Sequence, residues 1–222
     1  MRNSNYVDLK LLDYCDASMI QKKIQKKRIN NEIDDVFIFV EHNPVITIGR
    51  AGGYEHLKVT ENILAERGIQ LHYVDRGGSI TIHEPGQLVI YPIINLELVG
   101  NDLIRHLYML EESTILVLNK LGIHSAREKK NTGVWVHQSK IASIGVSSRS
   151  GVTRHGMALN VNNEVDIFNL INPCGLTNCS VTSISKVLKK EVAMSKIKNF
   201  MIDALEKTFC VKIKKIALDL LL

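Results

Sequence analysis

Apolar side chains recur at helical spacing in two long stretches of the chain. Residues 101–121 and 195–209 each place leucine, isoleucine and other apolar residues on one face, which predicts two amphipathic helices. Asn101 is the expected N-cap of the first helix, and Gly122 is its expected end. Both helices therefore need an apolar surface to pack against.

Shorter patterns predict the remaining elements. Residues 16–29 alternate apolar and basic positions as a surface helix does, and residues 60–67, closed by Gly68, predict a short helix. Short apolar or alternating runs predict strands at 36–40, 45–48, 70–75, 79–83, 88–96, 133–136, 140–147 and 155–161.

The order of these elements predicts the fold class. Strands fill the middle of the chain and helices flank them, without a regular β-α-β alternation, so we expect an α+β fold with a mixed or antiparallel sheet. Glycine and proline turns separate the strands at 70–75, 79–83 and 88–96, and such turns are typical of hairpins. Because no repeat or linker divides the sequence, residues 1–222 are expected to form a single domain.

Composition excludes several classes of protein. The chain has 222 residues, 45% of them hydrophobic and 23% charged, which is typical of a globular domain and not of a disordered chain. No stretch approaches the ~18 uncharged apolar residues of a membrane helix, so no membrane partner is expected. The first ten residues lack the apolar core of a secretory signal, which favours a cytoplasmic location.

The net charge is modest and gathered in patches. The chain carries 28 Lys and Arg against 23 Asp and Glu, a net charge of +5, and no nucleic-acid partner is expected from so small an excess. The two patches are either solvated helix faces or a docking surface for an acidic protein. They comprise Lys22, Lys23, Lys26, Lys27 and Arg28, and then Lys186, Lys189, Lys190, Lys196 and Lys198.

Motifs for metals and nucleotides are missing. The four cysteines form no Cys-x-x-Cys pair, and the eight histidines are scattered, so neither a disulfide framework nor a metal site is expected. The chain has no Gly-x-x-x-x-Gly-Lys-Ser/Thr loop and no Gly-x-Gly-x-x-Gly. An ATP or NAD site would have to be built in another way.

Three segments carry candidate chemistry. Arg76-Gly77-Gly78 either brings backbone N–H groups close to a ligand or forms a plain hairpin turn. His83 ends an alternating strand and is either a site residue or a core imidazole. Cys174, within Asn172-Pro173-Cys174-Gly175, is either a nucleophile exposed at a turn or a buried structural thiol.

Five motifs in sequence order add a resemblance. The chain resembles the lipoyl (octanoyl) transferase family over residues 70–185, and the end segments carry little of it. The motifs are Arg76-Gly77-Gly78-Ser79-Ile80-Thr81-Ile82-His83-Glu84-Pro85-Gly86-Gln87-Leu88-Val89-Ile90-Tyr91-Pro92, Thr132-Gly133-Val134-Trp135-Val136, Lys140-Ile141-Ala142-Ser143-Ile144-Gly145, His155-Gly156-Met157-Ala158-Leu159-Asn160-Val161 and Ile171-Asn172-Pro173-Cys174-Gly175.

The resemblance implies a fold, a reaction and a site. The fold would be that of the catalytic domains of biotin and lipoate protein ligases. As an acyltransferase, the chain would move octanoyl from an acyl carrier protein to a lysine ε-amine, with Cys174 as the thioester nucleophile and Lys140 as its partner. The residues that match the acyl pocket of the family are Arg76, Gly77, Gly78, Ser79, Ile80, Thr81, Ile82, His83, Ser143, Ile144, Gly145, Gly156, Met157 and Ala158.

The same resemblance implies the partners of the chain and its cofactor requirements. The acceptors would be lipoyl domains of 2-oxoacid dehydrogenases and the glycine cleavage H protein, the chain would act as a monomer, and neither ATP nor a metal would be required. Small residues such as Gly145, Gly156 and Ala158 would leave room for a straight acyl chain. Lys140 would favour the Cys174 thiolate, and a neutral Lys140 would accept the proton of the incoming amine.

Two other functions remain open at this point. An ATP-dependent lipoate protein ligase of the same fold would not need Cys174, and a noncatalytic acyl-binding protein would need neither Cys174 nor Lys140. The chain also departs from the family at Glu84, where glycine is usual. We expect the Glu84 side chain to point to solvent.

Overall fold

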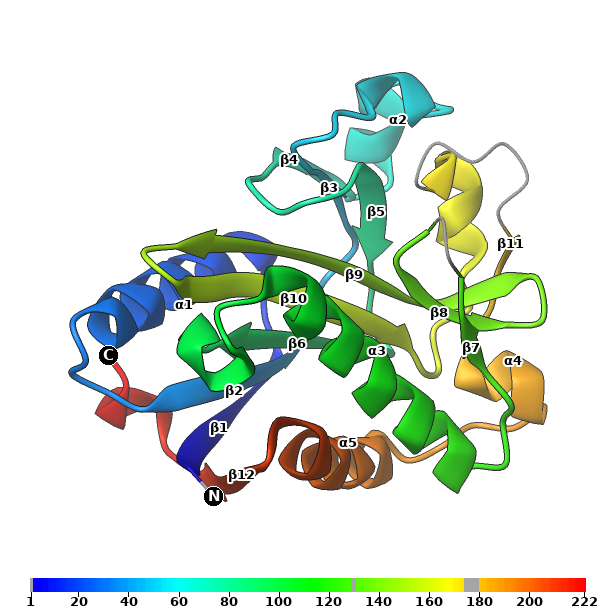
Figure 1. Cartoon of the computed structure of the whole chain (residues 1–222). Helices are drawn as coiled ribbons and strands as arrows, with labels where there is room; N and C mark the ends of the chain where they lie inside the picture. The colour runs from blue at the N-terminus through cyan, green and yellow to red at the C-terminus, as the bar shows by residue number, and fades with distance from the viewer. Residues whose placement is uncertain (1, 129–130, 174–179) are drawn as a thin grey trace.

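A large mixed sheet forms the centre of the molecule. The computed structural model describes residues 2–128, 131–173 and 180–222. Within these ranges the sheet consists of β1 (Arg2–Leu11), β2 (Asp35–Glu41), β6 (Gln87–Ile93), β7 (Ala126–Arg127), β8 (Gly133–Val136), β9 (Ser139–Arg149), β10 (Val152–Asn160), β11 (Ser180–Val181) and β12 (Val211–Lys215). Its order is β12-β1-β2-β6-β10-β9-β8-β7, with β11 beside β9 (Figure 1).

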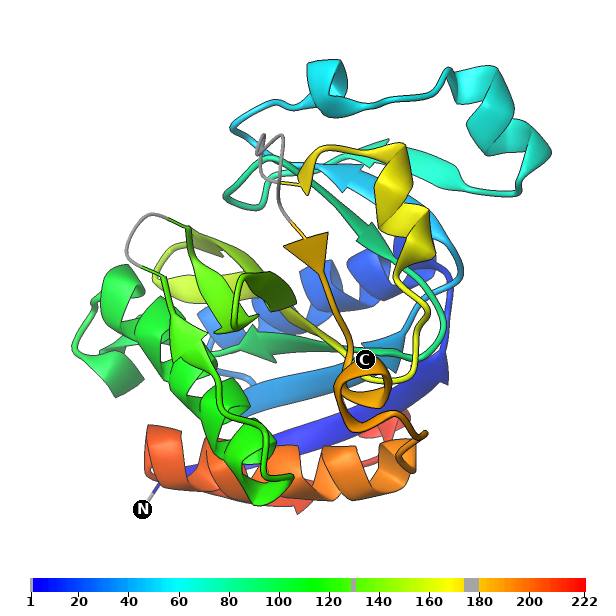
Figure 2. The same cartoon turned by 90° about the vertical axis from the view of Figure 1, so that its right-hand side faces the viewer.

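A second, smaller sheet stands above the first (Figures 1 and 2). It contains β3 (Val45–Ile48), β4 (Gln70–Tyr73) and β5 (Ile80–His83) in the order β4-β3-β5. The predicted hairpins are therefore wrong, because β3 lies between β4 and β5, and β5 and β6 belong to different sheets. Glycine and proline mark where the chain turns, but they do not determine which strand it then pairs with.

Helices cover both faces of the large sheet. Helix α1 (Tyr14–Ile29) lies on one face, and α3 (Leu103–Lys120) and α5 (Met194–Phe209) lie side by side on the other (Figures 1 and 2). Helix α2 (Glu61–Glu66) packs against the small sheet. Short elements complete the described fold: α4 (Ile184–Leu188) and the 3₁₀ turns Tyr54–His56, Leu96–Val99, Asp166–Leu170 and Leu218–Leu220.

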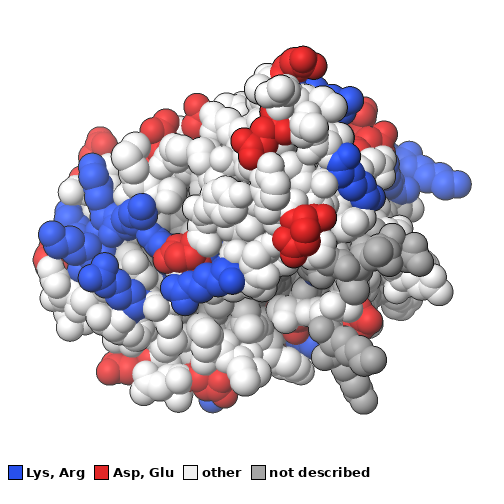
Figure 3. Space-filling model, turned by 90° about the horizontal axis from the view of Figure 1, so that it is seen from above, with Lys and Arg blue, Asp and Glu red and all other residues white. Residues whose placement is uncertain are grey.

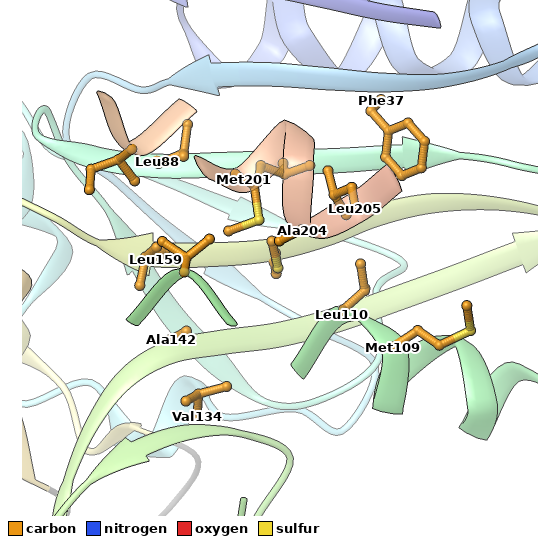
Figure 4. Close-up of a cluster of buried hydrophobic side chains, with 14 of the residues drawn as sticks. Phe37, Leu88, Met109, Leu110, Val134, Ala142, Leu159, Met201, Ala204 and Leu205 are labelled. Atoms are coloured by element: carbon orange, nitrogen blue, oxygen red, sulfur yellow. The ribbon is translucent and has the colours of Figure 1, made fainter. Parts of the chain in front are cut away.

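Alternation along the central strands builds a core on each face of the large sheet. Phe37 and Phe39 of β2 join the core under α3 and α5, whereas Ile38 joins the core under α1. Figure 4 shows part of the first core, including Phe37. Each fully buried side chain of this size contributes about 1.5–3 kcal/mol through the hydrophobic effect. The α+β class and the mixed sheet flanked by helices are confirmed.

The helix predictions need small corrections. The cap of α3 is Asp102 and not Asn101, since the Asp102 carboxylate accepts hydrogen bonds from the backbone N–H groups of Ile104 (2.8 Å) and Arg105 (3.0 Å). Helix α1 begins at Tyr14, two residues before the predicted start. Strands β1 and β12 were not predicted. None of the helices in the described ranges combines the length and the apolar character needed to cross a membrane.

Candidate active site

A cavity of about 430 Å³ gathers the predicted pocket residues. Arg76, Gly77, Gly78, Ser79, Ile80, Thr81, His83, Lys140, Ser143, Ile144, Gly145, Gly156, Met157 and Ala158 all line it. Ile82 does not line the cavity, and its side chain is fully buried in the core of the small sheet. The rest of the predicted set therefore converges on one space from three separate segments.

The predicted nucleophile, Cys174, lies outside the described residues. Its neighbour in sequence, Pro173, lines the cavity. On the other side of the undescribed segment, Val181 of β11 pairs with Lys140 of β9, and the N–H of Thr182 donates to the Lys140 carbonyl over 2.9 Å. The described chain therefore reaches the cavity just before Cys174 and the strand of Lys140 shortly after it.

A β-bulge turns Lys140 and Ser143 toward the same space. In a regular strand, residues three apart face opposite sides of the sheet. Here the pairing of β8 with β9 shifts, so that Val134 opposes Ala142 while Trp135 opposes Lys140, which leaves Ile141 as an extra residue. Ile141 and Ala142 then both enter the core under α3 and α5, and Lys140 and Ser143 both line the cavity.

The Lys140 side chain occupies space that Gly133 leaves open. Lys140 is 3% exposed, and its Nζ lies 5.3 Å from the centre of the Trp135 ring. A Cβ on Gly133 would lie 2.5 Å from Lys140 Cε and 3.3 Å from Nζ. The Gly133 N–H donates to Glu111 Oε1 over 2.9 Å, which ties β8 to α3. Gly133 therefore has a steric role beside the predicted partner of the nucleophile.

Small residues of β9 and β10 form the floor of the cavity. Ser143 lies opposite Ala158, and Gly145 lies opposite Gly156. The space above Gly145 is partly taken by backbone, because a Cβ there would lie 2.6 Å from the Gly77 carbonyl oxygen. Gly145 therefore admits the loop of the small sheet.

The Arg76-Gly77-Gly78 segment holds the two sheets together. The Gly77 N–H donates to the Val146 carbonyl over 2.8 Å. The Arg76 guanidinium is buried and donates to the Thr47 carbonyl over 2.6 Å and to Thr47 Oγ1 over 2.9 Å. The segment is not a plain hairpin turn, because the Arg76 side chain holds it against Thr47 of β3.

A cluster of aromatic and histidine rings forms one wall of the cavity. We call Tyr14, His83, Tyr91 and His155 the ring wall, because all four line the cavity. Tyr14 stacks on His83 with ring centres 6.3 Å apart, and Tyr91 meets His155 edge-on at 6.4 Å. His42 packs behind them, and the Tyr91 hydroxyl hydrogen-bonds to His42 Nε2 over 2.8 Å.

Burial keeps the histidines of this wall neutral at pH 7. Burial lowers the pKa of His83 to about 3, and its Nδ1 hydrogen-bonds to Gln87 Oε1 over 2.7 Å. Burial also lowers the pKa of His155 to about 4, although the hydrogen bond to Asp75, 2.8 Å from Nε2 to Oδ1, acts in the opposite direction. Neither imidazole carries a charge that would attract an anion.

The Glu84 side chain does not simply point to solvent. Its carboxylate accepts a hydrogen bond from Asn163 Nδ2 over 2.9 Å, and burial raises its pKa. The expectation of a solvent-facing Glu84 is therefore wrong, because the chain after β10 provides an amide partner for the carboxylate.

Two solved structures have the same fold as this chain. Lipoate-protein ligase A bound with ATP matches with a TM-score of 0.76 at 15% identity, covering 100% of this chain and 92% of that one. Biotin protein ligase from Aquifex aeolicus matches with a TM-score of 0.57 at 11% identity, covering 95% and 71%. The fold is that of catalytic domains from lipoate and biotin ligases, as the sequence resemblance implied.

Closer similarity identifies the family. Residues 13–206 match the model of the lipoyl protein ligase A/B catalytic domain, and the chain belongs to this family. An octanoyltransferase of Caldanaerobacter subterraneus subsp. tengcongensis is 40% identical over 219 residues, covering 98% of this chain and 95% of the relative. Another, of Caldicellulosiruptor saccharolyticus, is 42% identical over 190 residues, covering 85% and 81%.

Sequence reasoning missed several lining residues. Tyr14 and Tyr91 of the ring wall line the cavity, as do Leu103 and Leu107 of α3. The two leucines lie four residues apart on the apolar face of a predicted helix, a spacing that indicates burial without indicating a cavity. The packing of α1 and α3 against the sheet brings Tyr14, Leu103 and Leu107 to the site, whereas Tyr91 lies on β6 of the sheet itself.

Proposed function

We propose that the chain transfers an octanoyl group from the thioester of an acyl carrier protein to the ε-amine of a lysine on a lipoyl domain, through a thioester on Cys174. The observation that supports this most is the 40% identity to an octanoyltransferase over nearly the whole of both chains. The cavity adds support, since it is lined by Lys140 and by Pro173, the residue before Cys174.

The reaction takes place in two acyl transfers. The Cys174 thiolate attacks the donor carbonyl, a new C–S bond forms, and the thiolate of the carrier leaves. The lysine amine then attacks the Cys174 thioester, a C–N bond forms, and the Cys174 thiolate leaves. Lys140 serves as the proton relay, accepting the proton released by the amine and returning one to the departing thiolate. Overall, one thioester and one amine give one amide and one thiol.

This route needs no activating cofactor. A thioester is a more reactive acyl donor than an amide, so the transfer is downhill and neither ATP nor a metal is required. The histidines of the ring wall are uncharged at pH 7, and this suits a hydrocarbon chain beside them.

The acceptors in this proposal are lipoyl domains of 2-oxoacid dehydrogenases and the glycine cleavage H protein. An exposed basic face of α1 contributes to the docking of the acidic partner proteins. Lys22, Lys23 and Lys26 are exposed, and Figure 3 shows Lys and Arg gathered on the side where α1 lies. These three lysines make no ion pair within the described part of the chain. In the second patch, by contrast, Lys186 pairs with Asp166 over 2.9 Å.

Mass spectrometry of the intact protein tests the proposal. Incubation with octanoyl-acyl carrier protein should add about 126 Da, the mass of one octanoyl group replacing one hydrogen, as expected for covalent catalysis. The adduct should be lost in Cys174→Ala and kept in Cys210→Ala, which removes an exposed free thiol instead. An unmodified protein that still transfers the group would contradict the thioester route.

A second assay separates the proposal from an ATP-dependent ligase of the same fold. The chain is incubated with octanoate, ATP and a lipoyl domain, without any acyl carrier protein. No octanoylated domain is expected. Formation of product would favour ligase activity and overturn the proposal, and binding of the acyl group without transfer in either assay would indicate a noncatalytic acyl-binding protein.

A further inference from the structure

A buried carboxylate interrupts the apolar face of α3. Leu103, Leu107 and Glu111 follow one another at intervals of four residues and therefore share one side of the helix. The two leucines line the cavity, whereas Glu111, one turn further on, is 8% exposed and does not line it. A buried charge is costly unless partners compensate it, so the contacts of Glu111 show what the carboxylate holds.

Each oxygen of the Glu111 carboxylate accepts a different hydrogen bond. Oε2 accepts from Arg127 Nε over 3.1 Å, and Oε1 accepts from the Gly133 N–H over 2.9 Å. Arg127 has further contacts of its own, because its guanidinium stacks on the Tyr108 ring at 3.8 Å and pairs with Glu112. The arginine therefore balances the charge of Glu111, and the other oxygen holds the backbone of β8.

Glu111 binds β8 at the point where the pairing with β7 has ended. Arg127, the last residue of β7, lies opposite Val134, so this pairing stops one residue short of Gly133. The position of Gly133 decides the space for Lys140, because a Cβ on Gly133 would lie 2.5 Å from Lys140 Cε. A shift of the Gly133 backbone relative to α3 therefore changes the space that confines the lysine side chain.

We propose that Glu111 is a positioning residue for Lys140, since its carboxylate holds the Gly133 backbone at the place where that backbone confines the Lys140 side chain. This inference rests on the proposed function, in which Lys140 relays protons. Glu111 does not line the cavity and so does not touch the acyl group. Its loss should therefore slow the chemical step without weakening the binding of the acyl donor.

Two variants of nearly equal size test the role of the carboxylate. Glu111→Leu keeps apolar bulk on α3 but offers no acceptor to the Gly133 N–H, whereas Glu111→Gln keeps an acceptor oxygen. In both variants Arg127 retains Glu112 as its partner.

The assay is a single turnover, with the enzyme in excess over octanoyl-acyl carrier protein and with saturating lipoyl domain. The maximal rate constant of amide formation should fall about 100-fold in Glu111→Leu, as expected for a displacement of about 1 Å at a reacting group. The half-saturating enzyme concentration should stay within about twofold, because donor binding is unchanged. Glu111→Gln should restore the rate constant to within about tenfold of the unsubstituted protein, because the hydrogen bond to Gly133 is kept.

Asp35→Leu and Asp35→Asn are the matched controls. Asp35 is also a buried carboxylate, 5% exposed, that joins an arginine to a backbone N–H: its Oδ1 accepts from Arg28 Nε over 2.7 Å and from the Asn95 N–H over 2.9 Å. None of these three residues lines the cavity. Both control variants should therefore transfer octanoyl at the rate of the unsubstituted protein, even where they lose stability.

The outcomes separate the inference from the proposed function. If Glu111→Leu does not fold, Glu111→Met, which is unbranched and has only a weak acceptor, is measured for the same loss. A folded Glu111→Leu or Glu111→Met protein that is as fast as Asp35→Leu would overturn the inference alone. A Glu111→Gln protein as slow as Glu111→Leu would overturn it too, since the acceptor oxygen would then not matter. Absence of any octanoyl transfer by the unsubstituted protein would instead refute the proposed function.

Discussion

Gly133 should control the position of Lys140, and replacing it with alanine tests the geometry of the site directly. The new methyl group would lie 2.5 Å from Lys140 Cε and 2.5 Å from the Ala142 carbonyl oxygen. Carbon atoms do not approach other heavy atoms that closely, so the lysine side chain, the backbone of β9 or both must move. Gly133 also has a φ of 136°, a conformation that strains any residue with a side chain.

The expected losses follow from these two effects. Backbone strain at such a φ costs of order 1–3 kcal/mol. The steric conflict adds to this, so the free energy of unfolding should fall by about 2–4 kcal/mol. A displacement of about 1 Å at a reacting group costs about 100-fold in rate. We therefore expect kcat/KM for octanoyl transfer to fall by about 100-fold in Gly133→Ala.

Gly122→Ala separates strain from displacement. Gly122 also has a positive φ, 73°, but a Cβ there would meet no atom within 4 Å. This control should lose about 1 kcal/mol of stability, because an L-residue is disfavoured in the left-handed region, and it should keep its transfer rate. Urea unfolding and a steady-state transfer assay are measured on both variants. If Gly133→Ala transfers octanoyl at the rate of Gly122→Ala, the position of Lys140 beside Gly133 does not matter for the reaction, and the reasoning is refuted.

Three further outcomes can be measured. Burial lowers the pKa of His83 to about 3 and the pKa of His42, His106 and His155 to about 4, whereas a histidine in the unfolded chain has a pKa of ~6.5. The free energy of unfolding should therefore be greatest above pH ~6.5. It should fall toward pH 4, by up to about 1.4 kcal/mol per pH unit for each histidine. An acid-stable protein in pH-dependent urea unfolding would contradict these values. Both ring nitrogens of His106 are buried without a hydrogen-bond partner in the described chain, so His106→Leu should gain about 1–3 kcal/mol in the same assay. If α1 docks an acidic protein, KM for the donor protein should rise with salt, because the Debye length shortens to about 3 Å at 1 M; a KM that ignores salt would exclude the docking role.

Local patterns predicted the elements of the fold, and tertiary pairing accounts for what they missed. The apolar face of α3 was evident because Leu110 and Leu118 recur at helical spacing and both are fully buried. Strand β12, with Val211 and Ile213 facing inward between lysines, was missed because its alternation is short and mostly charged. The hairpin predictions failed because β4 finds its partner in β3, which precedes it by more than twenty residues.

The residues of the site could be predicted where they belong to sequence motifs, but not where tertiary packing brings them together. The pocket residues of β5, β9 and β10 follow from the resemblance, and all of them except Ile82 line one cavity. That Lys140 and Ser143 share a face was not predictable, because strict alternation places them on opposite sides and only the bulge at Ile141 reverses this. Tyr14 was missed because a single aromatic residue at the start of a helix carries no signal of a distant cavity.

The segment that contains Cys174 is anchored to both sheets. Before it, Ile171 bridges to Leu57, next to the small sheet; after it, Val181 pairs with Lys140 in the large sheet. The described residues on the two sides of Cys174 are therefore held by different sheets. Any substrate that moves one sheet relative to the other changes the distance between Ile171 and Val181.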